Sequence, residues 1–171
     1  KEQKEWYFSL IITLVFIGIA AVYAYIQNAA VPVISIDGVE FKLKQKASVL
    51  IDAGFEITGG TELASKTWDS SYEVKKNGVT YGYVTLYNKS SSTQPLSECC
   101  IGEFYTYKFS TIAYDKVMVN GVPVIGIEKS ELKDKFGVKE DDTVVSVSKG
   151  YTNIMFSDYD STTDTYNKVN L

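Results

Sequence analysis

Residues 6–26, WYFSLIITLVFIGIAAVYAYI, decide where we expect the rest of this chain to lie relative to a membrane. The stretch carries no charge, and a helix of its 21 residues is about 31 Å long at about 1.5 Å per residue. That length matches the hydrocarbon core of a bilayer, which is about 30 Å thick. Aromatic rings, which favour the headgroup layer, stand at both ends: Trp6, Tyr7, Tyr23 and Tyr25. The stretch therefore predicts one transmembrane helix.

The lysines that flank this stretch predict its orientation. Lys1 and Lys4 precede it, and the next basic residue after it is Lys42. Because cytoplasmic flanks of membrane helices are enriched in Lys and Arg, we expect residues 1–5 in the cytoplasm and residues 33–171 outside the cell. The predicted location is the cell membrane, crossed once, with the lipid bilayer as the partner of residues 6–26.

Two other interpretations of the apolar stretch remain open. The stretch resembles a cleaved signal peptide, with Ala24 or Ala30 before the cut, although signal-peptide cores usually span about 7–15 residues. It also resembles the apolar helix of a type IV pilin, but the Glu that pilins carry inside that helix is missing here. The pilin likeness keeps one alternative function: a structural subunit of a pilus-like or secretion assembly.

Composition argues against several functions. All 17 basic residues are Lys, there is no His, and the net charge is −4. Nucleic-acid binders usually use Arg on a basic surface, so we expect no nucleic-acid partner. Without His, the chain cannot form a Ser-His-Asp triad, a Cys-His dyad or a His-ligated zinc site. We therefore predict a non-catalytic protein with no cofactor and no metal.

Two short patterns have weak functional meaning. Asp158, Asp160 and Asp164 have the spacing of the first calcium-loop ligands, but the loop's Gly and bidentate Glu are missing, so we expect a hairpin turn. Asn88 with Ser90 matches a glycosylation acceptor, which has a meaning only in a eukaryotic secretory pathway.

A connector over 27–32 leads to a pattern that occurs twice. Residues 34–41 and 117–124 each predict a strand, an Asp-Gly or Asn-Gly turn and a second strand. Residues 46–54 and 128–137 each predict a short helix that ends at a Gly. The sequence thus indicates an internal duplication.

Each predicted helix is followed by predicted strands, over 72–74, 79–87, 143–147 and 152–156. We expect an α+β protein: a single transmembrane helix, then a duplicated hairpin–helix–antiparallel-strand domain with its helices on one face of a sheet. The repeat halves cover about 33–112 and 113–171.

This twofold order of hairpin, Gly-terminated helix and antiparallel strands resembles the tandem α+β repeat of β-lactamase inhibitory proteins and of small outer-membrane assembly lipoproteins. Residues 86–90 and 95–101 are similar to segments of membrane-anchored surface proteins of low-GC Gram-positive bacteria. The resemblance implies helices layered on one antiparallel sheet, whose open face contacts protein in the inhibitors. It implies no catalytic residue.

Tyrosines mark the candidate binding surface. Strand alternation puts Tyr81, Tyr83 and Tyr87 on one face, opposite Val84 and Leu86. By the same alternation, Tyr105 and Tyr107 share a face of the strand expected over 101–109. These five rings either form an outward surface that binds a protein or a cell-surface ligand, or they fill the core.

Cys99 and Cys100 are adjacent. In a strand they would point to opposite faces, so we expect one buried side chain. The other would be a free thiol or would form an intermolecular bridge, and a disulfide between the two would need a strained ring.

Overall fold

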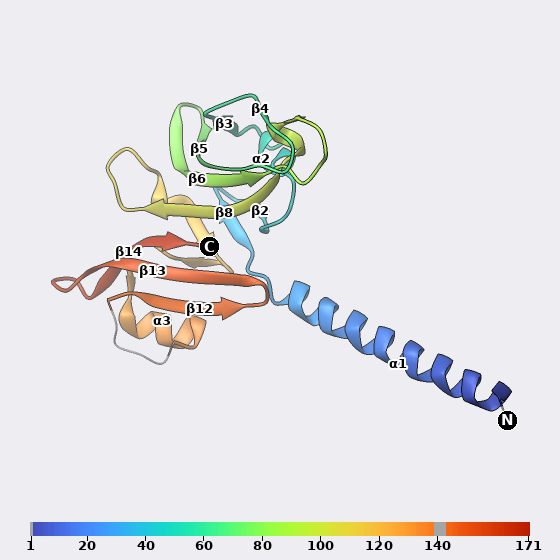
Figure 1. Ribbon diagram of the computed structural model, residues 1–171. Coiled ribbons are helices and arrows are strands. Elements are labelled where there is room, and N and C mark those ends of the chain that lie inside the picture. Colours follow the sequence, from blue (N-terminus) through green and yellow to red (C-terminus); the bar gives the residue numbers. More distant parts are fainter. Residues whose placement is uncertain (1, 139–142) are drawn as a thin grey trace.

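The computed structural model describes residues 2–138 and 143–171, which form a long helix and a head (Figure 1). The helix is α1 (Glu2–Ala29), and Figure 1 shows it running away from the head. Its segment Ser9–Ala29 has a mean hydropathy of 2.3 and none of it is buried in the protein. The predicted apolar helix is confirmed as one that could span a membrane, by a length and composition that a signal sequence shares.

A small four-stranded antiparallel sheet contains both predicted hairpins. Its strands are β1 (Ile34–Ile36), β2 (Val39–Phe41), β9 (Val117–Val119) and β10 (Val122–Pro123), in the order β10-β9-β1-β2. Positive φ angles at Asp37 and Gly38, and at Asn120 and Gly121, allow the two-residue turns. The two hairpins pair with each other through β1 and β9.

A larger antiparallel sheet contains most of the other strands. They are β3 (Glu56–Thr58), β5 (Trp68–Lys76), β6 (Val79–Tyr87), β8 (Cys100–Tyr107), β11 (Ile127–Glu128), β12 (Val145–Lys149), β13 (Thr152–Asp160) and β14 (Thr165–Asn170). Their order is β12-β13-β14-β8-β6-β5-β3, and β11 also pairs with β14. The pair β4 (Glu62–Leu63) and β7 (Gln94–Pro95) stands apart. The predicted strands fall in β5, β6, β12 and β13.

The helices of the head are short. They are α2 (Ser48–Ile51), α3 (Lys129–Phe136) and two single 3₁₀ turns, Leu96–Glu98 and Tyr114–Lys116. α3 ends at Gly137 with φ 72° and buries Leu132 and Phe136. The helix expected over 46–54 is only four residues long, since Ala47 at its start gives no side-chain cap and β-branched residues follow.

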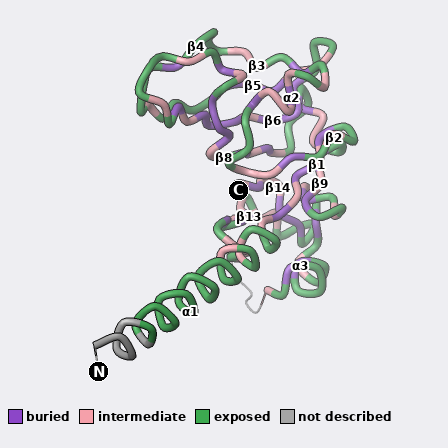
Figure 2. Tube along the Cα trace, turned by 90° about the vertical axis from the view of Figure 1, so that its right-hand side faces the viewer, coloured by how far each residue is buried: buried purple, intermediate pink, exposed green. Residues whose placement is uncertain are grey.

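Both sheets and both α-helices of the head contribute to one hydrophobic core (Figure 2). Phe41 of β2 packs edge-on against Phe104 of β8, with ring centroids 5.9 Å apart. Phe136 of α3 packs in the same way against Phe156 of β13, at 5.2 Å. The head is therefore an α+β structure dominated by antiparallel sheet.

Candidate functional site

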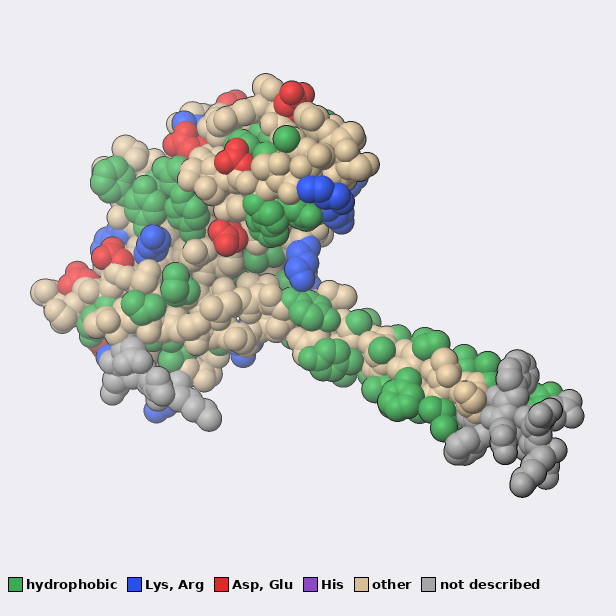
Figure 3. All heavy atoms as spheres, in the orientation of Figure 1, with side chains coloured by type: hydrophobic (Ala, Val, Ile, Leu, Met, Phe, Trp, Pro, Cys, Tyr) green, Lys and Arg blue, Asp and Glu red, His purple; other side chains and the backbone are tan. Residues whose placement is uncertain are grey.

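Five aromatic side chains lie on one face of β5, β6 and β8, and a sixth, Phe109, follows β8 and lies beside Tyr107; we call the six the aromatic face. They are Trp68, Tyr83, Tyr87, Tyr105, Tyr107 and Phe109. Strand pairing brings them together, because Tyr83 lies directly across from Tyr105 and Trp68 directly across from Tyr87. Figure 3 shows hydrophobic side chains gathered at the end of β8 that leads into the following loop. The prediction that Tyr105 and Tyr107 share a face is confirmed by the contact of both rings with Tyr83.

The central tyrosine rings stand upright on the sheet. The Tyr83 and Tyr105 rings are 5.0 Å apart and 13° from parallel, and the Tyr83 and Tyr107 rings are 6.1 Å apart at 3°. The first distance is close to the spacing between strands, about 4.8 Å, so the rings stack across the strands. The centre of the aromatic face consequently presents ring edges and hydroxyl groups rather than flat ring surfaces.

The hydroxyl group of Tyr83, at this centre, stays protonated. The hydrogen bond with Tyr107, together with burial, raises the pKa of Tyr83 to about 12. Tyr83 is therefore neutral at physiological pH. Its hydroxyl is a neutral group that can donate a hydrogen bond.

Trp68 and Phe109 extend this surface and were missed by the sequence analysis. Trp68 stacks on Tyr87 at 4.6 Å and is 58% exposed, and Phe109 lies 6.2 Å from Tyr107 and is 56% exposed. Trp68 lies over Gly102, where an added Cβ would collide with its ring. No local pattern marks Trp68, because its place depends on pairing with β6.

Charged side chains of both signs surround the rings. Glu73 lies across from Tyr83 on β5 and forms an ion pair with Lys75. Glu103 accepts a hydrogen bond from Thr85 Oγ1 at 3.0 Å. The Nζ of Lys168 on β14 lies 5.9 Å from the centre of the Tyr105 ring.

Tyr81 does not belong to this face, and its predicted place there is wrong. Val74 and Lys75 are consecutive in β5, but their partners in β6 are separated by Tyr81, which is the extra residue of a β-bulge. The bulge breaks the alternation, so the side chain turns into the core and is 8% exposed. There its ring packs edge-on against Phe55 at 5.5 Å.

Cys99 and Cys100 are both free, so no disulfide joins them, and both are buried, although only one buried side chain was expected. Only Cys100 lies in β8. Cys99 belongs to the turn before it and lies with its Sγ 3.5 Å from the carbonyl oxygen of Pro95. Burial raises the pKa of the Cys99 thiol. Neither thiol is placed to bridge to another protein.

The acidic pattern near the C-terminus forms the expected hairpin turn between β13 and β14. Asp160 Oδ1 accepts a hydrogen bond from the backbone N–H of Thr162 at 2.8 Å, and this bond lowers the pKa of Asp160. Within residues 2–138 and 143–171, no three His, Cys, Asp or Glu side chains gather as a metal-ligand set.

A scan against protein-family models and searches of curated proteins and of solved structures found no match. The resemblance to the tandem α+β repeat proteins therefore stays a prediction.

Proposed function

We propose that this protein is a non-catalytic interaction domain, held at the outside of the cell membrane by α1, that binds a partner protein through the aromatic face. The main support is the clustering of six aromatic side chains, five on one sheet face and Phe109 just after β8, surrounded by charges of both signs. Interfaces between proteins concentrate Trp and Tyr at their centre and polar groups at their rim. The tyrosines proposed for contact are Tyr83, Tyr87, Tyr105 and Tyr107, joined by Trp68 and Phe109.

The upright rings favour a protein over a flat ligand as the partner. A nucleobase stacks on an exposed ring surface, and the central tyrosines offer their edges instead. Ring edges and hydroxyl groups can pack against apolar side chains and hydrogen-bond to backbone groups at once. The surrounding Glu and Lys side chains would then select a partner with complementary charges.

Anchoring and orientation form the second part of the proposal. The uncharged segment of α1 is long enough for a bilayer, and Lys1 and Lys4 precede it. No catalytic step is included, because the chain has no His and both thiols are buried.

We also propose that the head arose by internal duplication, with its helices layered against the inner face of the sheet. The support lies in the strand order. The hairpins β1–β2 and β9–β10 pair through β1 and β9, and the meanders β5-β6-β8 and β12-β13-β14 pair antiparallel through β8 and β14. Both pairings are compatible with an approximate two-fold axis between the halves.

Crosslinking in intact cells tests the binding surface. A photoreactive residue in place of Phe109 is expected to give one reproducible crosslinked species. The matched control is the same residue in place of Val144, which is 50% exposed and lies outside the aromatic face. Equal products from both positions would contradict the proposal. A photoreactive residue in place of Gly18 in α1 gives a third comparison. Crosslinked products from this position but not from the Phe109 position would favour the alternative, a structural subunit of a pilus-like or secretion assembly.

A variant of the same protein tests the tyrosines themselves. Tyr83→Ala with Tyr105→Ala removes the stacked pair, and we expect the Phe109 crosslink to fall at least about tenfold, as for loss of a hot spot worth about 2 kcal/mol. Val79→Ala, an exposed position on the same strand, is the control. Circular dichroism checks that both variants remain folded. An unchanged crosslink in a folded double variant would refute the role of these tyrosines.

A further inference from the structure

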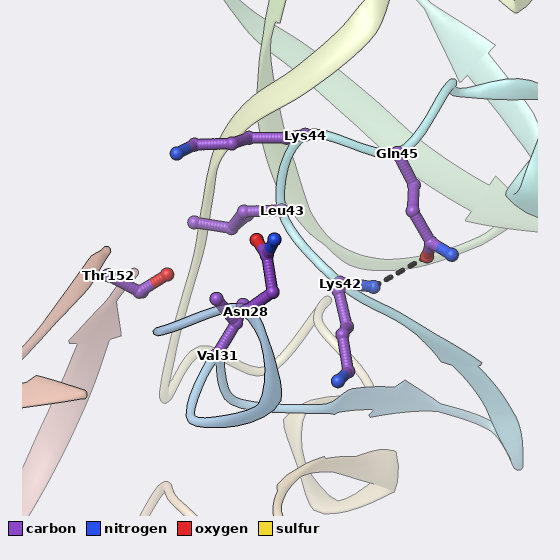
Figure 4. A pocket seen from close by; sticks show the side chains of 7 residues that line it. All are labelled: Asn28, Val31, Lys42, Leu43, Lys44, Gln45 and Thr152. Atoms are coloured by element: carbon purple, nitrogen blue, oxygen red, sulfur yellow. Dashed lines mark hydrogen bonds between the residues drawn. The ribbon is translucent and has the colours of Figure 1, made fainter. Parts of the chain in front are cut away.

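A recess of about 350 Å³ lies where α1 joins the head (Figure 4). It is lined by Asn28, Val31, Lys42, Leu43, Lys44, Gln45 and Thr152. In Figure 4, Asn28 lies between the Leu43 and Lys42 side chains, and Lys44 extends toward the side of Thr152. The recess thus combines the end of α1, the segment after β2 and the start of β13.

The turn between β12 and β13 holds these parts together. Gly150 in that turn lies so close to the connector that a Cβ there would collide with the carbonyl oxygen of Gln27. Next to Gly150, the Tyr151 ring lies 4.5 Å from Lys44 Nζ. The head is consequently packed onto the end of α1.

The recess is positively charged although the whole chain is acidic. Among the residues that the structure describes, no carboxylate lines it. Of the nearby lysines, Lys46 is paired with Glu98 at 2.6 Å, whereas neither Lys42 nor Lys44 has a carboxylate partner within 4 Å among the described residues. The Asn28 amide and the Thr152 hydroxyl add groups that can donate hydrogen bonds.

The recess lies at the depth of lipid headgroups if α1 spans the bilayer. Asn28 follows Ile26, the last residue of the uncharged stretch, by two positions, which is about 3 Å along the helix. The headgroup layer on each side of the hydrocarbon core is about 5–8 Å thick. Tyr151, which is 49% exposed beside the recess, is a residue type that favours this layer.

We propose that this recess binds the phosphate of an anionic phospholipid in the leaflet next to the head. Lys42 and Lys44, which extend from opposite ends of the recess in Figure 4, would attract the net negative charge of the headgroup, and Asn28 and Thr152 would donate hydrogen bonds to its phosphate oxygens. The inference rests on the proposed membrane anchoring, and it does not depend on which side of the membrane the head occupies.

The test uses the full chain in bilayer discs of equal zwitterionic and anionic phospholipid, followed by mild detergent release and native mass spectrometry. We expect the wild-type protein to retain one anionic lipid. Lys42→Gln with Lys44→Gln should lower the ratio of anionic to zwitterionic lipid retained at least about tenfold, given about 1 kcal/mol per lysine near a membrane surface. Lys108→Gln with Lys116→Gln, a pair of exposed lysines elsewhere on the head, should leave the ratio unchanged.

Three results would overturn the inference. Equal retention by the recess variant and the wild type would show that the lysines do not select the lipid. Binding of inorganic phosphate by protein in purely zwitterionic discs, seen by phosphorus NMR, would make the recess a site for free phosphate. Failure of the wild-type chain to enter the discs would refute the membrane anchor together with this site.

Discussion

The side chain of Asn88 organises the loops at one end of β6. It is 2% exposed, and its Nδ2 donates hydrogen bonds to the carbonyl oxygens of Leu63, Ala64 and Ser92 at 2.8–3.0 Å. Its Oδ1 accepts a hydrogen bond from the backbone N–H of Ser90 at 2.9 Å. An amide with every polar atom engaged and buried cannot accept a glycan in the folded protein, so the acceptor pattern at Asn88 is structural.

Asn88→Ala is therefore expected to lower the free energy of unfolding by about 2–3 kcal/mol, because one buried and three partly buried backbone groups lose their partners. Urea unfolding measures the change. Lys89→Ala, at the exposed neighbouring position, should change the free energy by less than about 0.5 kcal/mol. A loss below 1 kcal/mol in Asn88→Ala would mean that water replaces the amide.

Tyr72 makes stability depend on alkaline pH. Burial and the hydrogen bond that its hydroxyl donates to Asp69 Oδ2, at 2.7 Å, raise its pKa to about 12. In the unfolded chain a tyrosine ionises near pH 10, so the folded state holds this proton more tightly. The stabilisation is complete below pH 10 and is lost as the pH rises from about 10 to 12.

Replacing Tyr72 by Phe should make the fall in unfolding free energy between pH 10 and 12 shallower, by up to about 1.4 kcal/mol per pH unit. Urea unfolding at several pH values gives the two slopes. Tyr151→Phe, at an exposed ring, serves as the control. Identical slopes for wild type and Tyr72→Phe would contradict the raised pKa.

At the scale of single elements, β-bulges decide which side chains reach the aromatic face. The bulge at Tyr81 moves that ring into the core, and a second bulge in β8 leaves Gly102 as the extra residue opposite Thr85 and Leu86. Trp68 occupies the space over this glycine. One strand irregularity thus removes an aromatic ring from the face, and another provides the space for a different one.

Gly102→Ala is expected to displace Trp68 from its stack on Tyr87, because the new methyl group would occupy the same space as the indole. In a Trp6→Phe background, acrylamide quenching of the remaining tryptophan should increase. Gly18→Ala in α1, where a Cβ meets no atom within 4 Å, is the control and should leave quenching unchanged. Unaltered quenching in a folded Gly102→Ala protein would disprove the close packing.

For the whole molecule, the single core joins the two predicted halves. Side chains from residue 34 to residue 171 belong to one buried cluster, and β8 pairs directly with β14. We therefore expect Phe156→Ala to destabilise the entire head by about 3–5 kcal/mol in one cooperative transition. Two separate transitions in urea, followed by circular dichroism, would show that the halves unfold independently.

Anchoring and orientation can be checked on the complete protein. We expect it to stay in the membrane pellet after a carbonate wash and its head to be digested by protease added to intact cells. A Lys1→Gln, Lys4→Gln variant should show a larger protected fraction, because the flanking charges favour the cytoplasmic side. Release of the protein by carbonate would contradict the membrane anchor. Complete protection of the wild-type head from protease would contradict the proposed orientation.

The long helix, the two hairpins and α3 could be predicted from local signals. The uncharged stretch over 6–26 indicates the long helix by its length alone, and the Asp-Gly and Asn-Gly pairs indicate the two hairpins because they allow positive φ angles. Gly137 indicates the end of α3 for the same reason. In each case the determining interactions lie within a few residues along the chain.

The composition of the candidate site was decided by the tertiary structure. Alternation along β6 correctly groups Tyr83 with Tyr87, but it fails at Tyr81, where one extra residue reverses the side-chain direction. Trp68 joins the aromatic face through its pairing with Tyr87, which is far away in the sequence. In the same way, Lys42 and Lys44 line the recess because the segment after β2 lies beside the end of α1. Strand register and bulges are set by packing between distant segments, and no local pattern in the sequence encodes that packing.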